Sequence, residues 1–217
     1  MIKTIIFDLG GVVITLSPDQ AVSRFEQLGL DDARQQMDSY TQTGIFGDLE
    51  SGRIDAETFR RLLSQKVGHP VTMAQCNYAW QGYAGEVPRR NLDNLVRLRR
   101  EGYRLVLLSN TNPCMMEWVD SQRFDGRGHS IRYYFDALYL SYEMKVMKPD
   151  EAFFLRVLEH EQVLPHECLF IDDGPRNVEA AASIGMNTLC PKNGEDWSGQ
   201  LSIALQFHSE KQIRINK

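Results

Sequence analysis

The stretch Ile5-Ile6-Phe7-Asp8-Leu9-Gly10-Gly11-Val12 decides how this chain folds. Apolar residues lead into an aspartate and two glycines, which is the pattern of a short buried strand that ends in a tight loop. Asp8 is therefore expected at the carboxyl end of a strand, and open α/β sheets bind their ligands at that edge. The stretch predicts a parallel sheet with chemistry at Asp8.

Short apolar runs recur downstream and alternate with amphipathic helical segments. This alternation is typical of an α/β fold with a doubly wound, Rossmann-like parallel sheet and crossover helices. The expected strands are Thr4–Phe7, Arg104–Leu108, Ala137–Leu140, Cys168–Ile171 and Asn187–Leu189. The expected crossover helices cover 91–100, 151–160 and 177–184, whereas the segment after about 195 is weakly patterned.

The segment 16–87 interrupts this alternation. It has no strand pattern and favours helices at 19–28, 31–42, 55–66 and 72–83, the third opened by Asp55 as an N-cap. Roughly seventy residues are too many for an ordinary strand-to-helix connection. We therefore expect a helical cap at 16–87, inserted after the first strand of an α/β core made of 1–15 and 88–217.

The composition narrows the class of protein. A chain of 217 residues with a formal net charge of −5 lacks the basic surplus of nucleic-acid-binding proteins. Its apolar runs are shorter than the about 20 residues that span a bilayer. The cysteines, Cys76, Cys114, Cys168 and Cys190, form no C-x-x-C pair, which favours reduced thiols and a cytoplasmic location. We expect a small-molecule ligand, and neither nucleic acid nor a membrane as partner; the oligomeric state is not readable.

Polar residues follow four of the expected strands at their carboxyl ends. Each has a structural explanation on its own, because aspartates end strands in turns, Ser-Asn-Thr-Asn suits a helix N-cap, and Lys-Pro often precedes a helix. Adjacent aspartates are harder to explain this way, since crowded carboxylates repel unless a positive charge neutralises them. Together these residues predict one site at one sheet edge: Asp8, Ser109–Asn112, Lys148–Asp150 and Asp172–Asp173.

These residue types suit phosphoryl transfer. A carboxylate nucleophile at Asp8 can accept a phosphoryl group. A hard cation such as Mg²⁺ prefers carboxylate oxygens, and Asp172 and Asp173 supply more of them. Lys148 adds a compact positive charge, and the Ser109 hydroxyl with nearby main-chain N–H groups can bind a phosphate oxygen.

The order of these motifs resembles the haloacid dehalogenase-like hydrolases, in their phosphatase branch with a small helical cap, over essentially the whole chain. Within that family the chain is similar to bacterial sugar-phosphate phosphatases of the glucose-1-phosphate type. The resemblance implies a Mg²⁺-dependent phosphate-monoester hydrolase that forms an aspartyl phosphate on Asp8. The resemblance implies that Asp8 is the nucleophile and Lys148 the catalytic lysine, and that Ser109, Asn110, Gly10 and Gly11 bind the phosphate. It also implies that Asp8, the Gly10 carbonyl and Asp173 bind the metal, that Asp172 supports them, and that Asn177 is a polar residue behind them.

Gly10 departs from the family pattern, in which most phosphatases carry a second aspartate that serves as general acid and base. Such catalysis is worth about 10²–10⁴-fold in rate. Several alternatives follow: a good leaving group such as an anomeric sugar phosphate, a proton from an acid in the cap (Asp19, Asp48 or Glu50), phosphotransferase activity, or a binding protein with weak catalysis. A metal-free 2-haloacid dehalogenase also lacks this aspartate, but it does not require the Asp172-Asp173 pair.

The substrate is less well defined by the sequence. A small cap that must exclude water favours a small soluble phosphate ester, with sugar phosphates among the candidates. Phe46, Trp80 and Tyr83 either face the substrate or pack the cap, and aromatic residues at helical spacing more often pack.

Overall fold

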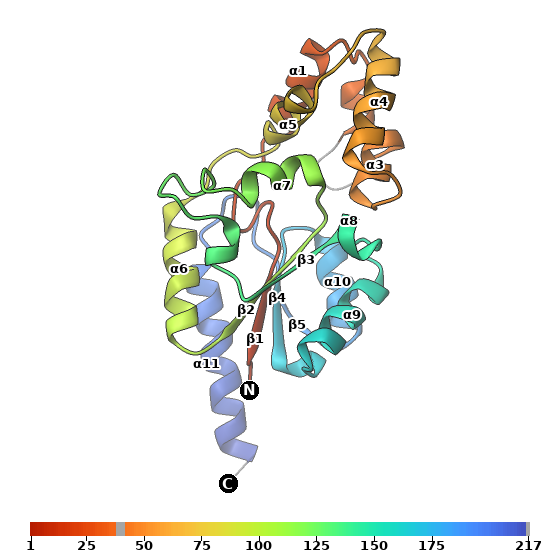
Figure 1. The fold of residues 1–217 in the computed structure, drawn as a ribbon. Coiled ribbons are helices and arrows are strands. Elements are labelled where there is room, and N and C mark those ends of the chain that lie inside the picture. The colour runs from red at the N-terminus through yellow and green to blue at the C-terminus, as the bar shows by residue number, and fades with distance from the viewer. Residues whose placement is uncertain (38–41, 216–217) are drawn as a thin grey trace.

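A five-stranded parallel sheet forms the centre of the part of the chain that the computed structural model describes, residues 1–37 and 42–215 (Figure 1). Its strands are β1 (Thr4–Phe7), β2 (Arg104–Ser109), β3 (Ala137–Leu140), β4 (Cys168–Ile171) and β5 (Asn187–Leu189), in the order β3-β2-β1-β4-β5. The predicted strands and the doubly wound α/β class are confirmed, with Ser109 added to β2. Since the order reverses between β1 and β4, the crevice at their carboxyl ends is where this fold places ligands.

The adjacent strands β1 and β4 are buried on both faces, as expected for the centre of a parallel sheet. Ile5 and Phe7 point into one hydrophobic cluster, and Ile6 between them points into the other. Helices α6 (Arg89–Arg100) and α11 (Ser198–Ile215) cover the first face, and α9 (Glu151–Glu161) and α10 (Pro175–Ser183) cover the second (Figure 1). The alternating strand residues therefore fix β1 in the middle of the core.

Outside the segment between β1 and α6, two short helices and one long one were not expected from the sequence: α7 (Pro113–Val119), α8 (Ser141–Met144) and α11. The start of α11 is fixed by Trp197, whose Nε1 donates to the Val12 carbonyl at 2.9 Å. Leu201 and Leu205 are buried one and two turns later, but Ile203 is exposed. This mixture of buried and exposed apolar residues blurs the periodicity that predicts helices from sequence.

The five helices described between β1 and α6 pack around a hydrophobic cluster of their own, above the carboxyl edge of the sheet (Figure 1). They are α1 (Pro18–Gln27), α2 (Ala33–Gln36), α3 (Gly44–Glu50), α4 (Ala56–Val67) and α5 (Met73–Gln81). Asp55 is the predicted N-cap of α4, since its side chain accepts from Thr58 N. The exact division into 1–15 with 88–217 and 16–87 stays a prediction.

Of the predicted helix at 31–42, the described residues form one helical turn, α2, and residues 38–41 lie outside the described residues. Helix α2 ends at Gln36 because Met37 is extended, with φ −127° and ψ 123°. The next helix, α3, begins at Gly44 and was not predicted.

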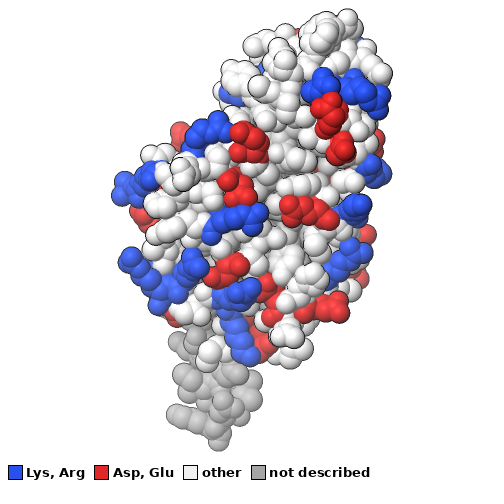
Figure 2. Space-filling view, viewed as in Figure 1, with Lys and Arg blue, Asp and Glu red and all other residues white. Residues whose placement is uncertain are grey.

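Charges of both signs are interspersed on the face shown in Figure 2, without a continuous basic stripe there. The basic cluster at the end of α6 illustrates this, because Arg97 pairs with Glu101 at 2.7 Å. Among the described residues, no helix has the length and apolar character needed to cross a membrane.

Candidate active site

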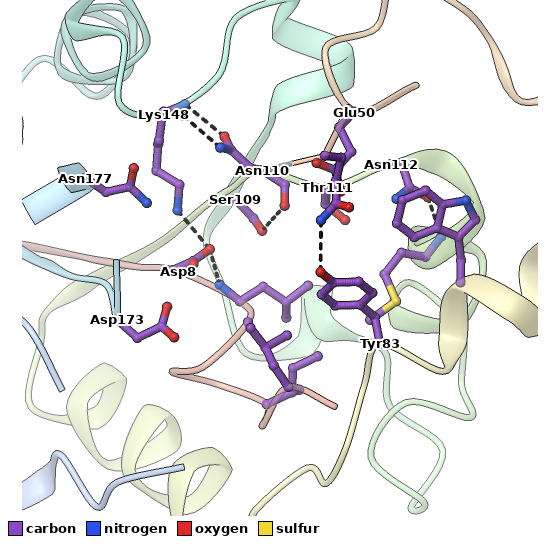
Figure 3. A pocket seen from close by; sticks show the side chains of 17 residues that line it. Asp8, Glu50, Tyr83, Ser109, Asn110, Thr111, Asn112, Lys148, Asp173 and Asn177 are labelled. Atoms are coloured by element: carbon purple, nitrogen blue, oxygen red, sulfur yellow. Dashed lines mark hydrogen bonds and ion pairs between the residues drawn. The ribbon is translucent and has the colours of Figure 1, made fainter. Parts of the chain in front are cut away.

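A cavity lies at the carboxyl edge of the sheet, and both the core and the cap helices line it (Figure 3). It collects all but four of the residues predicted at this sheet edge; those outside its lining are Gly11, Asp172, Pro149 and Asp150. The residues that line it are Asp8, Leu9, Gly10, Ile14, Leu16, Gln42, Glu50, Trp80, Tyr83, Ser109, Asn110, Thr111, Asn112, Met115, Lys148, Asp173 and Asn177. Four lining residues were not predicted, because nothing in their local sequence shows that they reach this cavity: Ile14, Leu16, Gln42 and Met115.

Asp8 follows β1 directly and is held by its main chain and by one carboxylate oxygen. Its N–H donates to Ile171 O at 2.9 Å, which continues the β1–β4 pairing. Its Oδ1 accepts from Leu9 N at 2.7 Å and lies 2.9 Å from Lys148 Nζ. Burial raises the pKa of Asp8 to about 6, because it outweighs the opposing effect of the Lys148 charge; the Asp172 charge also raises this pKa. The carboxylate is thus oriented toward the cavity and stabilised by one ammonium group.

Lys148 lies between two aspartates and is almost fully buried. Its Nζ is 2.6 Å from Asp172 Oδ2 and 2.9 Å from Asp8 Oδ1, and it donates to Leu108 O at 3.0 Å. Burial on its own lowers the pKa of Lys148, but the charges of Asp172 and Asp8 outweigh burial and raise it. Lys148 is therefore a fixed positive charge beside Asp8.

Asn110 and Ser109 hold the end of β2 against this lysine. The Asn110 side chain donates from Nδ2 to Lys148 O at 2.9 Å and accepts from Lys148 N at 2.9 Å. This positioning role of Asn110 was not anticipated from the sequence. The Ser109 hydroxyl is 3.4 Å from Asn110 O, and both residues line the cavity (Figure 3). Their phosphate-binding role stays a prediction.

Asp172 and Asp173 end β4 and differ in their surroundings. Asp172 is fully buried, and its carboxylate accepts from Gly174 N at 2.7 Å and from Asn177 Nδ2 at 3.0 Å, besides Lys148. Asp173 lines the cavity, and burial followed by the charges of Asp8 and Asp172 raises its pKa to about 7. Asn177 therefore orients Asp172 and also lines the cavity; its role behind the metal ligands stays a prediction.

One oxygen from each of Asp8, Asp172 and Asp173 lies within 4.8 Å of the others. Burial is the main cause of the raised pKa of Asp8 and of Asp173, and the charges of the neighbouring aspartates add to it. A hard divalent cation is the group that such a set of oxygen donors fits. Gly11 permits the approach, because with φ +75° a Cβ at this position would lie 2.2 Å from Asp173 Oδ2.

Among the cap residues proposed from sequence, some reach the cavity and others do not. Glu50, Trp80 and Tyr83 line it, and Tyr83 OH accepts from Gln42 Nε2 at 2.9 Å. Phe46 does not line it; it is fully buried and packs edge-to-face on Phe25 at 4.9 Å between ring centroids.

Two of the cap acids considered as proton donors pair with arginines instead. Asp19 contacts Arg34 at 2.8 Å, and Asp48 contacts Arg53 at 2.7 Å. Neither lines the cavity. Of the three acids considered, Glu50 is therefore the one that lines the cavity, and a proton-donating role for it stays a prediction.

Ser141, which the sequence did not mark, joins the cap to the core beside this cavity. Its hydroxyl lies 2.6 Å from Glu50 O and 3.0 Å from Thr111 O, and accepts from Thr111 N at 3.0 Å. Asn112, one residue further, caps α7 by accepting from Met115 N at 3.0 Å. The loop after β2 and the end of α3 are thus held together.

The family model described as haloacid dehalogenase-like hydrolase matches residues 2–185, which is most of the chain. The chain belongs to this family of hydrolases.

Relatives with similarity over nearly their whole length place it in the phosphatase branch. D-ribitol-5-phosphate phosphatase of Bacteroides thetaiotaomicron is 42% identical over 205 residues, which are 94% of this chain and 99% of the relative. A HAD-like family hydrolase from Porphyromonas gingivalis superimposes with a TM-score of 0.89 at 40% identity, over 94% of this chain and 98% of that one. A HAD family enzyme of B. thetaiotaomicron was solved as an Asp-to-Ala variant with magnesium and inorganic phosphate. It superimposes with a TM-score of 0.86 at 36% identity, over 93% of this chain and 99% of that one.

Proposed function

We propose that this protein hydrolyses a small phosphate monoester through an aspartyl phosphate on Asp8. The observation that carries the proposal is the position of the Asp8 carboxylate, which lines the cavity 2.9 Å from Lys148 Nζ and beside the other acids. A carboxylate held next to a fixed ammonium is suited to approach an anionic phosphoryl group, because the ammonium reduces the repulsion between them.

Magnesium is the proposed cofactor, held by Asp8, Asp173 and the carbonyl of Gly10, with Asp172 as the supporting carboxylate. The crowding of three carboxylates around one lysine supports this assignment. The related B. thetaiotaomicron enzyme was solved with magnesium and inorganic phosphate. Bound here, the ion would neutralise the charge of the phosphate and of the nucleophile.

The chain's own groups would act as follows. An Asp8 oxygen attacks phosphorus, the bond from phosphorus to the ester oxygen breaks, and the leaving oxygen takes a proton to become an alcohol. Water then attacks the aspartyl phosphate, gives up a proton, and releases phosphate and the free carboxylate. Lys148 stabilises the negative charge in both steps, and Ser109 with the main chain of Asn110 binds the phosphoryl oxygens.

The substrate class that we propose is a sugar or polyol phosphate. The most direct support is the 42% identity to a phosphatase of D-ribitol 5-phosphate. The cap, for which we propose the bounds 16–87, would cover the non-phosphate part of this substrate and exclude water. The core would comprise 1–15 and 88–217.

The test is release of inorganic phosphate from a panel of sugar, polyol and simple alkyl phosphates, with Mg²⁺ and with excess chelator. We expect Mg²⁺-dependent release that Asp8→Asn abolishes. Asp93→Asn is the matched control, because Asp93 is an exposed aspartate on α6 that pairs only with Arg89, at 3.5 Å, among the described residues. Release from no member of the panel would overturn the proposal. Transfer of phosphate to an added alcohol instead of water would favour the phosphotransferase alternative. Release of halide from a 2-halo acid without metal would favour a dehalogenase.

A further inference from the structure

We propose that Asn193 is a positioning residue of the candidate active site, which holds Leu16 in place and so fixes one wall of the cavity beside Asp8. Asn193 lies in the loop after β5, 177 residues from Leu16 along the chain. Its effect on substrate binding rests on the proposed phosphatase function, whereas its hold on Leu16 can be tested without a substrate.

The hydrogen bonds between Asn193 and Leu16 use both polar groups of the Leu16 main chain. Leu16 N donates to Asn193 Oδ1 at 2.9 Å, and Asn193 Nδ2 donates to Leu16 O at 3.2 Å. The planar amide of asparagine offers an acceptor and a donor side by side, so it can take the place of a peptide group in a neighbouring strand. One side chain thus fixes both the position and the orientation of this part of the main chain.

The opposite edge of the same segment is bound to residues 83–86. Thr15 N donates to Glu86 O at 2.9 Å, and Gly85 N donates to Thr15 O at 2.8 Å. Successive residues of a paired segment direct their main-chain polar groups to opposite edges. The N–H and carbonyl of Leu16 therefore face away from this pairing, and Asn193 supplies their partner.

The loop that carries Asn193 is itself anchored on two sides. Arg90 Nη2, on α6, donates to Gly194 O at 2.7 Å, and Gly194 N donates to Gly11 O at 3.3 Å. The loop after β5 is thus tied both to a core helix and to the loop after β1. Because its support is fixed in this way, the Asn193 amide can act as a rigid partner for Leu16.

The side chain of Leu16 forms part of an apolar wall of the cavity, together with Leu9 and Ile14. It lies close to Gly10, since a Cβ added at position 10 would be 2.8 Å from Leu16 Cδ2. The fit of a small ligand depends on where such apolar walls stand. A displaced Leu16 would therefore change how the ester is bound.

The reacting groups are held by contacts that do not involve Asn193. Asp8 Oδ1 accepts from Leu9 N at 2.7 Å and lies 2.9 Å from Lys148 Nζ. Loss of Asn193 should therefore weaken the binding of substrate and leave the chemical step intact. A rise in KM at constant kcat is the sign of lost binding that the ground state and the transition state share.

The first experiment measures hydrolysis of D-ribitol 5-phosphate, and of p-nitrophenyl phosphate as a second ester, in saturating Mg²⁺. We expect Asn193→Ala to raise KM at least about threefold with kcat nearly unchanged. Asn187→Ala is the matched control and should change neither constant. Asn187 begins β5 outside the cavity lining, and its Nδ2 also donates to a distant main chain, to His166 O at 3.0 Å and to Cys168 O at 2.9 Å.

The second experiment needs no substrate, because it measures the melting temperature, Tm. Gly10→Ala places a methyl group against Leu16 and is expected to lower Tm. In the Asn193→Ala background Leu16 can move aside, so Gly10→Ala should lower Tm by about half as much or less. In the Asn187→Ala background the full effect of Gly10→Ala should remain.

The outcomes separate this inference from the proposed function. An unchanged KM in Asn193→Ala would overturn the inference, and so would a lower kcat at unchanged KM, which indicates only a loss of folded enzyme. An equal effect of Gly10→Ala on Tm with and without Asn193 would overturn it as well. If wild type hydrolyses neither ester, the proposed function fails, and the melting temperatures alone decide whether Asn193 holds Leu16.

Discussion

The side chain of Leu16 lies against Gly10 and fills the space beside the proposed nucleophile. A Cβ added at position 10 would be 2.8 Å from Leu16 Cδ2 and 3.3 Å from Cδ1. The main chain of Leu16 is held in place by Asn193, which accepts from Leu16 N at 2.9 Å and donates to Leu16 O at 3.2 Å. The absence of a carboxylate at position 10 is thus matched by an apolar side chain in its place.

This contact predicts how the missing carboxylate can be restored. Gly10→Asp alone is expected to give little gain in kcat on alkyl phosphates, because Leu16 crowds the new side chain. Combined with Leu16→Ala, it should raise kcat at least about tenfold, which is a fraction of the 10²–10⁴-fold typical of general acid–base catalysis. Steady-state kinetics on a polyol phosphate measures this. The idea is wrong if Leu16→Ala by itself gives the same increase.

The close approach of Gly11 to Asp173 predicts that a larger residue at position 11 weakens the binding of Mg²⁺. A methyl group at this position would lie 2.2 Å from Asp173 Oδ2 and push that carboxylate away. We expect Gly11→Ala to raise the Mg²⁺ concentration for half-maximal activity at least about tenfold. Titration of phosphate release with Mg²⁺ measures it.

Gly102→Ala is the matched control for this substitution. Gly102 also has a positive φ, +91°, but nothing lies within 4 Å of an added Cβ. Both variants should lose about 1–2 kcal/mol of stability from backbone strain, and Gly102→Ala should keep the wild-type Mg²⁺ dependence. An equal shift in both would mean that strain, and not Asp173, is the cause.

The hydrogen bonds between Asn110 and the Lys148 main chain predict that the position of Lys148 depends on Asn110 as well as on the aspartates. Asn110→Ala removes both hydrogen bonds to the Lys148 main chain, each worth about 0.5–1.5 kcal/mol. We expect kcat to fall at least about tenfold as Lys148 shifts, with a smaller change in KM, since misplacement of a catalytic group is costly. Asn94→Ala, which removes two side-chain hydrogen bonds within α6, should leave kcat unchanged. A rise in KM with unchanged kcat would indicate that Asn110 binds the phosphate instead.

A buried carboxylate far from the site predicts a pH dependence of stability. Burial alone raises the pKa of Glu161, but hydrogen bonds from Arg104 and from Tyr139, the latter at 2.7 Å, outweigh it and hold that pKa below its ordinary 4.5. The stabilisation is therefore complete above pH 4.5 and is lost as the pH falls through the folded-state pKa. Urea unfolding at several pH values should show wild type exceeding Glu161→Gln in stability at pH 6, and the difference shrinking toward pH 3. A pH-independent difference would contradict the linkage.

The sheet could be predicted from the sequence because its signals are local. Each strand is a short apolar run closed by turn residues, and Ile5, Ile6 and Phe7 are buried on both faces as such runs require. Helix α4 was predicted because Asp55 marks its start. Helix α11 was not, since its anchor is the contact between Trp197 and Val12, which lie far apart in the chain.

The acids and the lysine could also be predicted, because parallel strands bring their carboxyl ends to one edge. This geometry collects Asp8, Lys148 and Asp172 without any knowledge of side-chain packing. The cap residues could not be sorted in the same way. Asp19, Asp48 and Glu50 are alike in sequence, and the pairing of the first two with Arg34 and Arg53 depends on how the helices fold together.

The sequence by itself determined which segments form strands, the edge at which the chemistry lies, and the lack of a second carboxylate at Gly10. Only the tertiary structure decided that Leu16 fills that space, that Asn110 holds Lys148, and that Glu50 reaches the cavity of Asp8. The physical reason is the range of the interactions. Apolar periodicity and turn residues act within a few positions, whereas contacts between distant segments depend on how whole helices and strands pack.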